Sequence, residues 1–411
     1  MSRRIAMRIH SWIALCLVVA LPAHAESPPS LARAFAAAWE RQPVAQALSE
    51  RERAVQARRS AADALTAQPP SLELAGRSDR FNQARGATEY DLGLALPLWL
   101  PGERSGSQAL AEAEGGALAG RAAALRLQLA GAVRQAWWDW QLARNETALA
   151  DERVGAAQRL RDDVARRVAA GDLARSDQHQ AEGALATARA QRAEGLAGLE
   201  EARYRLHSLT GQPPGEVGAV SEPDLTDAAA AEAMAEHPGL RELAGRREVS
   251  QRNVDLARTR SRANPELTIA TRRERSLAGE AMEQTWALGL RIPFSSAARQ
   301  DAQIAEANAE LIEASLGAER ERERIVQDVA AARSRAEAAR LRLAASEERA
   351  RLARENRDFF DKSFRLGESD LPTRLRIEQE AFEAERQAAR ARINLAASRS
   401  AYRQALGLLP E

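Results

Sequence analysis

The sequence is poor in the residues on which many kinds of function depend. Among its 411 residues it has one cysteine, and aromatic residues make up only 4%. Because that cysteine, Cys16, lies in an N-terminal apolar run, the rest of the chain can form no disulfide and has no thiol chemistry. Lys362 is the only lysine, and the net charge is +1, so the chain lacks the concentrated positive charge that nucleic-acid binding requires.

The first 25 residues have the pattern of a secretory signal peptide. A basic start precedes the apolar run "WIALCLVVAL" at 12–21, and "AHA" at 23–25 supplies the small residues that a signal peptidase recognises. We therefore expect export, with a mature chain that begins at Glu26. A lipoprotein acylated at Cys16 is an alternative, but Cys16 lies in the middle of the run and follows the bulky Leu15.

The composition indicates long helices rather than an ordinary globular domain. Alanine, arginine, glutamate, leucine and glutamine dominate, and charged residues make up 28%. From Gly102 there is no proline until Pro213, and apolar positions recur at heptad-like spacing. A helix over residues 103–170 would be about 100 Å long at 1.5 Å per residue. Long rods are expected.

The chain contains the same pattern twice. "YDLGLALPLW" at 90–99 is repeated as "WALGLRIPFS" at 286–295, and "PSLEL" at 70–74 as "PELTI" at 265–269. Further pairs follow in the same order, such as "AAGDL" at 169–173 and "RLGES" at 365–369. This predicts an internal duplication. The first repeat spans 26–211, a linker 212–227, the second repeat 228–407 and a C-terminal tail 408–411.

Each repeat is expected to contain a helix, two strands, a very long helix, a sharp break and a shorter helix. In the first repeat we predict a helix at 31–67, strands at 71–78 and 88–98, a helix at 103–170, a break at 171 and a helix to 211. In the second repeat we predict a helix at 228–263, strands at 266–273 and 284–294, a helix at 296–366, a break at 367 and a helix at 370–407. The fold class is therefore mainly α with a small β part.

The repeated phrase alternates strictly between large apolar and small or polar residues. Alternation over about ten residues is typical of a strand that faces lipid on one side, and about ten residues span a bilayer when tilted. A half-buried strand of a soluble sheet is the alternative. The residues expected on the lipid side or at the membrane interface are Tyr90, Leu92, Leu94, Leu96, Trp99, Trp286, Leu288, Leu290, Ile292 and Phe294. Asp91 and Arg291 fall on the opposite face.

Four strands cannot close into a barrel, and open sheet edges are not tolerated in lipid. If the strands span a membrane, several copies of the chain must share one barrel. Two copies would give about eight strands and three about twelve, the smallest membrane barrels having about eight.

With its duplication, its strand pairs and its glycine breaks, the sequence resembles the TolC family of outer-membrane efflux proteins over about residues 30–407. The resemblance implies a homotrimer, with a 12-stranded β-barrel in the outer membrane of a Gram-negative bacterium and a coiled-coil α-helical barrel in the periplasm. It implies the exit duct of a tripartite pump, with a periplasmic adaptor protein and an inner-membrane transporter of the RND type as partners. The short chain is most similar to the heavy-metal and cation efflux branch (CzcC/CusC-type).

The resemblance places the two breaks at the periplasmic entrance, where the adaptor docks. Leu173 and Leu371 would be docking points, and acidic residues after the turns would favour cations. Asp177 matches an acidic position of the family, but Thr373 stands at the corresponding place in the second copy. The residues expected at this entrance are Gly171, Asp172, Leu173, Asp177, Gly367, Glu368, Asp370 and Leu371.

No catalytic or metal-binding pattern is present in the sequence. Ser176, Asp177 and His179 would point to different faces of a helix, and the histidines are scattered without ligand spacing. We expect no enzyme activity and no cofactor, and we interpret Trp137, Trp138 and Trp140 as packing residues. The alternatives are a periplasmic coiled-coil scaffold or adaptor without a membrane span and, within the fold, an outer-membrane component for type I secretion or drug efflux.

Overall fold

The computed structural model describes residues 30–411 except 83, 216–221 and 295–296, so the expected signal peptide lies outside the described residues. The elements are α1 (Leu31–Glu40), α2 (Pro43–Ala62), β1 (Ser71–Ser78), β2 (Thr88–Pro97), α3 (Glu103–Ala170), α4 (Arg175–Thr210), α5 (Asp227–Ala235), α6 (Pro238–Thr259), β3 (Glu266–Arg275), β4 (Glu283–Arg291), α7 (Ala297–Arg365) and α8 (Leu371–Ala405). Their order confirms the predicted fold class.

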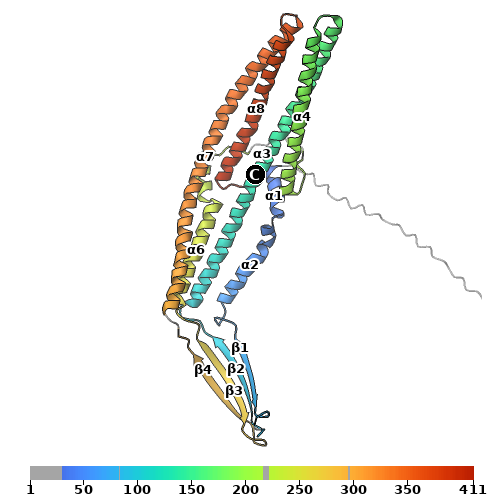
Figure 1. The fold of residues 1–411 in the computed structure, drawn as a ribbon. Helices are drawn as coiled ribbons and strands as arrows, with labels where there is room; N and C mark the ends of the chain where they lie inside the picture. The colour runs from blue at the N-terminus through green and yellow to red at the C-terminus, as the bar shows by residue number, and fades with distance from the viewer. Residues whose placement is uncertain (1–29, 83, 216–221, 295–296) are drawn as a thin grey trace, which may run out of the picture.

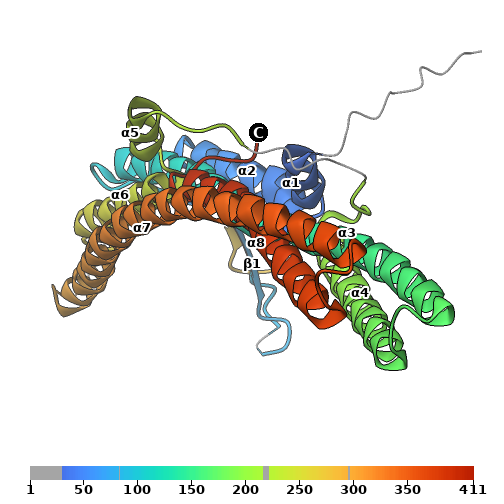
Figure 2. The ribbon, with the colours of Figure 1, turned by 90° about the horizontal axis from the view of Figure 1, so that it is seen from above.

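The molecule is elongated, with the sheet at one end and two helical hairpins at the other (Figure 1). α3 has 68 residues and α7 has 69, which corresponds to about 100 Å each at 1.5 Å per residue. Seen from above, the helices lie in a curved layer (Figure 2). Of the helices that the structure describes, none is both long enough and apolar enough to cross a membrane.

Glycine ends both long helices in the same way. Gly171 follows α3 with φ 87°, and Gly367 follows α7 with φ 79°, a conformation that favours glycine. At the first break the Asp172 N–H donates to the Arg167 carbonyl at 2.9 Å, and at the second the Glu368 N–H donates to the Ser363 carbonyl at 2.9 Å. Each is a Schellman motif, which satisfies carbonyls that the helix end leaves free.

The helices expected at 31–67 and 228–263 are each broken in two, which corrects the prediction. The first breaks before Pro43, where Gln42 has ψ 128°, and the second before Pro238, where His237 has ψ 122°. A residue before proline avoids the helical region, because the proline ring collides with its backbone. Both repeats therefore have a short helix followed by a longer one.

The four strands form one antiparallel sheet in the order β1-β2-β3-β4. β2 and β3, from different repeats, pair over ten residues from Thr88↔Arg275 to Pro97↔Glu266. β4 ends at Arg291, three residues before the predicted end at 294. Within the described residues, the outer edges of β1 and β4 pair with no further strand.

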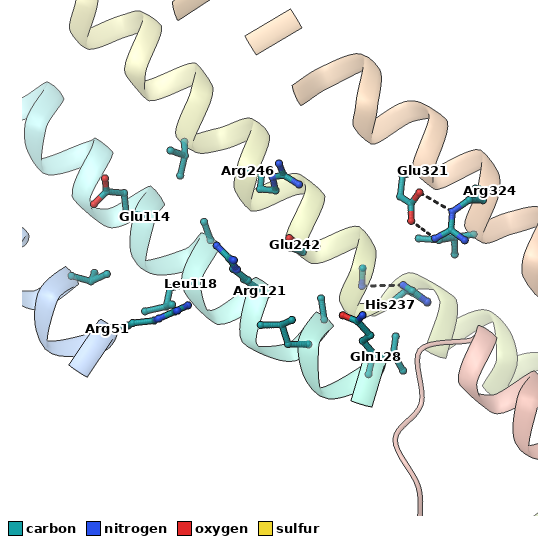
Figure 3. A pocket seen from close by; sticks show the side chains of 18 of the residues that line it. Arg51, Glu114, Leu118, Arg121, Gln128, His237, Glu242, Arg246, Glu321 and Arg324 are labelled. Atoms are coloured by element: carbon teal, nitrogen blue, oxygen red, sulfur yellow. Dashed lines mark hydrogen bonds and ion pairs between the residues drawn. The ribbon is translucent and has the colours of Figure 1, made fainter. Parts of the chain in front are cut away.

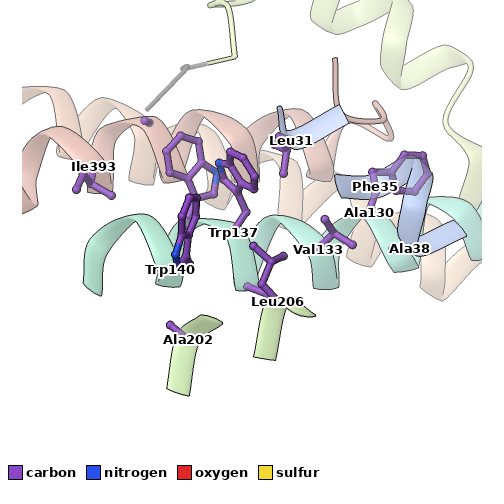
Figure 4. Packing of buried hydrophobic residues seen from close by; sticks show 13 residues of the cluster. Leu31, Phe35, Ala38, Ala130, Val133, Trp137, Trp140, Ala202, Leu206 and Ile393 are labelled. Carbon is purple, nitrogen blue, oxygen red and sulfur yellow. The ribbon is translucent and has the colours of Figure 1, made fainter. Parts of the chain in front are cut away.

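The main core lies midway along the helices and is built around α3 (Figure 4). Trp137 and Trp140 meet edge to face with ring centroids 5.4 Å apart. They pack with Phe35 of α1, Leu206 of α4 and Ile393 of α8. The interpretation of the tryptophans as packing residues is confirmed.

A buried ionic cluster fixes the linker to this core. Nη2 of Arg134 in α3 lies 2.7 Å from Oε1 of Glu222 in the linker, and both side chains are buried. Arg134 also donates to the Leu408 carbonyl at 2.9 Å, and Arg403 of α8 donates to the Pro223 carbonyl at 3.3 Å. The cluster joins parts of the chain that are up to 274 residues apart, and no local pattern of residues predicts it.

Candidate functional site

The sheet has two chemically distinct faces. The strand register places one set of residues on an apolar face: Leu72, Leu74, Gly76, Tyr90, Leu92, Leu94, Leu96, Leu267, Ile269, Thr271, Arg273, Arg275, Gln284, Trp286, Leu288 and Leu290. The alternate residues form a polar face, which includes Asp91 and Arg291. The predicted separation of Asp91 and Arg291 from the leucines therefore agrees with the register.

Burial along β2 is the reverse of that in a water-soluble sheet, and both faces of β1 and β4 are exposed. The leucines are exposed, with Leu74 at 75% and Leu288 at 75%, and so is Trp286 at 72%. On the polar face, Ala95 is only 1% exposed. Contiguous exposed apolar surface marks a contact with lipid or protein. The apolar face therefore requires a covering that this chain alone does not supply.

Acidic residues outnumber arginines on the polar face. Its carboxylates are Glu73, Glu89, Asp91, Glu266, Glu274 and Glu283, and its arginines are Arg77, Arg272 and Arg291. Arg272 pairs with Asp91 at 2.8 Å and with Glu89 at 3.0 Å, whereas Arg291 is only loosely paired with Glu266 at 3.8 Å. The polar face keeps an excess of negative charge after these pairs are counted.

Three residues expected on the lipid side or at the membrane interface lie where the sheet meets the helices: Trp99, Ile292 and Phe294. Nε1 of Trp99 donates to the Ala64 carbonyl at 3.0 Å and so ties β2 to the end of α2. Ile292 and Phe294 follow β4 and are 40% and 90% exposed. They lie beyond the strand end, and Phe294 is one of the most exposed aromatic side chains described.

The tips of the two hairpins are joined through Phe364. This residue of α7 is 2% exposed and packs in a cluster with Leu160 and Val164 of α3. The guanidinium carbon of Arg167 (α3) lies 5.1 Å from its ring centroid, and that of Arg374 (α8) lies 4.8 Å from it. Cation–π contacts of this kind stabilise by about 0.5–2 kcal/mol. They connect the two repeats at the end away from the sheet.

Two of the predicted acidic tip residues cap helices. The Asp177 carboxylate accepts a hydrogen bond from the Ala174 N–H at 3.0 Å, and the Asp370 carboxylate accepts one from the Thr373 N–H at 3.0 Å. Hydrogen bonds from Thr373 lower the pKa of Asp370 below its ordinary value, so it stays charged. Asp172 and Glu368 are exposed on the turns, beside Gly171 and Gly367.

The leucines at the tips differ from the expectation. Leu371 is 1% exposed and packs against the Phe364 cluster, and Leu173 is half-buried at its edge. Leu371 therefore stabilises the tip and presents no docking surface in this conformation. Leu366, beside Gly367, is 74% exposed. Leu366 is absent from the predicted set because that set contains only leucines on the C-terminal side of each glycine.

A cleft with a volume of about 970 Å³ lies between α2, α3, α6 and α7 (Figure 3). Charged side chains of both signs line it, including Arg121, Glu242 and the pair Glu321–Arg324, in which Nε donates at 2.8 Å. Nδ1 of His237 accepts a hydrogen bond from the Gly239 N–H at 3.1 Å, and burial lowers the pKa of His237. We find no convergent catalytic arrangement there.

Among the described residues, no three acidic, histidine or cysteine side chains are placed to hold a metal ion. Ser176, Asp177 and His179 lie within the first turns of α4, with Asp177 engaged as a cap.

No known family model matches the sequence, and no curated protein matches it. Solved structures do match the fold. A membrane protein from Pseudomonas aeruginosa has a TM-score of 0.75 at 18% identity, over 94% of this chain and 98% of that one. CusC, which forms a transmembrane channel, has 0.75 at 16%, over 93% and 92%. The CmeC outer membrane channel of Campylobacter jejuni has 0.73 at 14%, over 99% and 94%.

At this identity the likeness shows the fold. The chain has the long-helix and four-strand architecture of outer-membrane channel protomers, and these matched structures are channels rather than enzymes. CusC and CmeC are matched almost equally, so the comparison does not single out the heavy-metal branch.

Proposed function

We propose that the protein is the outer-membrane exit duct of a tripartite efflux system. In this function it passively conducts substrate from an inner-membrane pump and a periplasmic adaptor to the exterior of a Gram-negative bacterium. The observation that carries the proposal is the sheet with its apolar face exposed: leucines stand exposed on that face, while Gly93 and Ala95 of β2 are buried on the polar face. Such a sheet is stable where the apolar face meets lipid and the polar face meets a water-filled lumen.

The open edges of the sheet support assembly. β1 and β4 each leave one row of backbone groups without a strand partner among the described residues, and in lipid every backbone group must be paired. Pairing β4 of one copy with β1 of the next would satisfy both edges. Three copies would form a 12-stranded barrel, and we propose this homotrimer.

A stripe on α7 supports the same assembly. Several large apolar residues remain exposed along this helix, and we call this set the α7 stripe: Ile312, Leu316, Val326, Leu341, Leu352 and Phe359. At 3.6 residues per turn they fall within an arc of about 80°. The residues of α7 that are buried, such as Ile325 and Ala350, lie on the opposite side of the helix. A second copy of the chain would cover the α7 stripe.

The hairpin tips are proposed as the entrance and the adaptor-docking end. They lie at the end of the helices farthest from the sheet (Figure 1). Asp172 and Glu368 stand exposed on the two turns, and Leu366 and Leu173 offer the accessible apolar surface. Together with the acidic polar face of the sheet, these carboxylates favour cations, so metal cations or other small toxic cations are the proposed cargo.

The test is to reconstitute the protein, extracted from outer membranes in detergent, into planar lipid bilayers. We expect discrete conductance steps with a reversal potential that shows cation preference, and a three-fold hollow particle by electron microscopy. A protein that remains soluble without detergent and gives no conductance would contradict the duct and favour a periplasmic scaffold. Conductance with anion preference would leave the duct standing and overturn the proposed cation cargo.

A further inference from the structure

Two arginines stand on the apolar face, at the end of the sheet away from the helices. In the strand register Arg273 lies opposite Tyr90, and Arg275 lies opposite Thr88. All the strand carboxylates, from Glu73 to Glu283, lie on the polar face. The positive charge of the two arginines is therefore not neutralised on its own face.

Arg273 differs in its contacts from the arginine next to it. Arg272, on the polar face, binds the carboxylates of Asp91 and Glu89. The Arg273 side chain is exposed, and its guanidinium makes no hydrogen bond or ion pair with any residue that the structure describes. The Tyr90 hydroxyl, across the strand pair, likewise has no described partner and belongs to a side chain that is 57% exposed. Two polar groups that can donate hydrogen bonds thus stand side by side without an acceptor.

A groove lies beside these two side chains. It has a volume of about 370 Å³, and its walls include Leu74, Leu92, Tyr90 and Arg273. Asp91 also lines it, but the strand register puts that residue on the polar face, where its carboxylate pairs with Arg272 at 2.8 Å. Gly76 forms part of its floor, because a Cβ at that position would lie 3.7 Å from the Tyr90 ring. The groove is therefore apolar along most of its length and positively charged at one end.

The inference rests on the proposed function, in which the sheet spans a membrane and its apolar face meets lipid. An arginine on the lipid face costs about 2–4 kcal/mol at the bilayer midplane but about 0–1 kcal/mol near the interface. Tyrosine also prefers the interface. The level of Tyr90 and Arg273 is thus the level of the lipid headgroups in the leaflet at the loop end of the sheet.

We propose that Arg273, Tyr90 and Gly76 form a binding site for a phosphorylated lipid of that leaflet. The phosphate accepts hydrogen bonds from the guanidinium group of Arg273, which matches phosphate geometry, and an acyl chain lies in the groove over Gly76. The groove continues into the exposed leucines of the apolar face. An occupant that fits both parts has an anionic head and an apolar chain, which favours a lipid over a free anion.

The test is native mass spectrometry of the detergent-extracted oligomer with three probes: lipid A, dephosphorylated lipid A and inorganic phosphate. We expect the protein to retain lipid A in preference to the dephosphorylated form, and inorganic phosphate not to displace it. Arg273→Gln should lower the affinity for lipid A about five-fold, as expected for one basic residue at a membrane surface. Gly76→Val should lower it by filling the groove while leaving every charge in place.

Arg291→Gln is the matched control, because it removes the same charge from the polar face. It should retain lipid A as the unchanged protein does. Equal retention of both lipids, displacement by inorganic phosphate, or an equal loss in Arg291→Gln would each overturn the lipid site. Conductance in planar bilayers is recorded for every variant, so that a protein that conducts but shows no lipid preference refutes only this inference. One that forms no channel refutes the proposed function as well.

Discussion

The two long helices have almost the same length and occupy the same place in their repeats, yet their surroundings differ. α3 has sixteen buried residues, and no large apolar residue of α3 is exposed. In the described part of α7 only Ile325, Ala332, Ala350 and Phe364 are buried, while the α7 stripe is exposed along it. Trp137 and its neighbours correspond to residues between 331 and 336, which include no aromatic side chain.

The difference shows that two similar repeats of one chain can place the same helix in different surroundings. The first copy keeps α3 at the centre of the core, in contact with helices of both repeats. In the second repeat, the side of α7 that carries the α7 stripe is exposed. Because exposed apolar surface of this extent is costly in water, it is retained where another surface covers it. The comparison therefore separates residues that pack the core of one copy from residues that would contact another copy in the proposed oligomer.

The largest expected effect on stability comes from a substitution in the core around α3. Trp137→Ala should lower the free energy of unfolding by about 4 kcal/mol, since removal of a fully buried aromatic side chain leaves a cavity. Thermal unfolding followed by far-ultraviolet circular dichroism measures it. Phe359→Ala, at a 69% exposed site of the α7 stripe, is the comparison variant: within one copy it removes no buried contact, so its loss should be much smaller and confined to the contact between copies. Equal losses would contradict the division between the two helices.

Arg134→Ala should be the next largest change. It leaves the buried Glu222 carboxylate short of its 2.7 Å partner, and breaking a buried ion pair costs about 3–5 kcal/mol; the remaining contact with Arg403 places this case at the lower end. Denaturant unfolding provides the measurement. Arg333→Ala, which removes an exposed pair with Asp227 from α7, should have no measurable effect. A stable Arg134→Ala protein would show that the linker is held by other contacts.

Leu341→Glu should act on assembly rather than on folding. Leu341 is 68% exposed in the α7 stripe, and burying such a side chain contributes about 1.5–3 kcal/mol. The substitution should weaken the contact between copies by ten-fold or more while the helical content stays the same. Sedimentation in detergent measures the oligomer. Arg342→Glu, beside the stripe, should assemble normally, and dissociation of both variants would place the interface elsewhere.

The two tips should respond alike, in contrast to the two helices. Gly171 and Gly367 both have positive φ, and a Cβ at either position would meet no atom within 4 Å. Gly171→Ala and Gly367→Ala should therefore each cost about 1–2 kcal/mol through backbone strain alone. Unfolding measurements on the two variants, side by side, test this. A much larger loss in one of them would reveal a tertiary role for that turn.

The smallest effect concerns pH. Burial keeps the pKa of His237 below its ordinary value of 6.5, and its neutral Nδ1 accepts the Gly239 N–H. The unfolded chain therefore binds the proton first, so the contribution of His237 is complete above pH 6.5 and is lost as pH falls through and below that value. His237→Asn should keep the cap and flatten the pH dependence of the melting temperature. If the melting temperature of His237→Asn depends on pH as that of the unchanged protein does, other titratable groups cause the pH dependence.

Much of the fold could be predicted from local signals. The bounds of α3 and β1 agree with the prediction, because Gly102, Gly171 and the paired prolines at 69 and 70 end elements wherever the chain goes. The breaks before Pro43 and Pro238 carried an equally local signal. The predicted continuous helices are wrong there, because a proline moves the preceding residue out of the helical region even where the surrounding composition favours a helix.

The candidate site was predicted only in part. Alternation separated Leu92 from Asp91, but the register that pairs Asp91 with Arg272 joins residues 181 positions apart. Leu371 was expected on the surface and is buried, because its position on α8 brings it against Phe364 of α7. No periodicity in one helix reveals which of its sides another helix will cover.

The duplication, the lengths of the long helices, the positions of the turns and the alternation along the strands could all be predicted from the residue order, because each depends on residues near one another in the chain. Packing in three dimensions places α3 in the core and leaves one side of α7 exposed, brings Arg134 to Glu222, and pairs Arg272 with carboxylates on the polar face while Arg273 stands on the apolar face, unpaired with any described residue. The reason is physical: burial and charge pairing depend on which surfaces meet in space, and two repeats with the same local pattern can meet different neighbours.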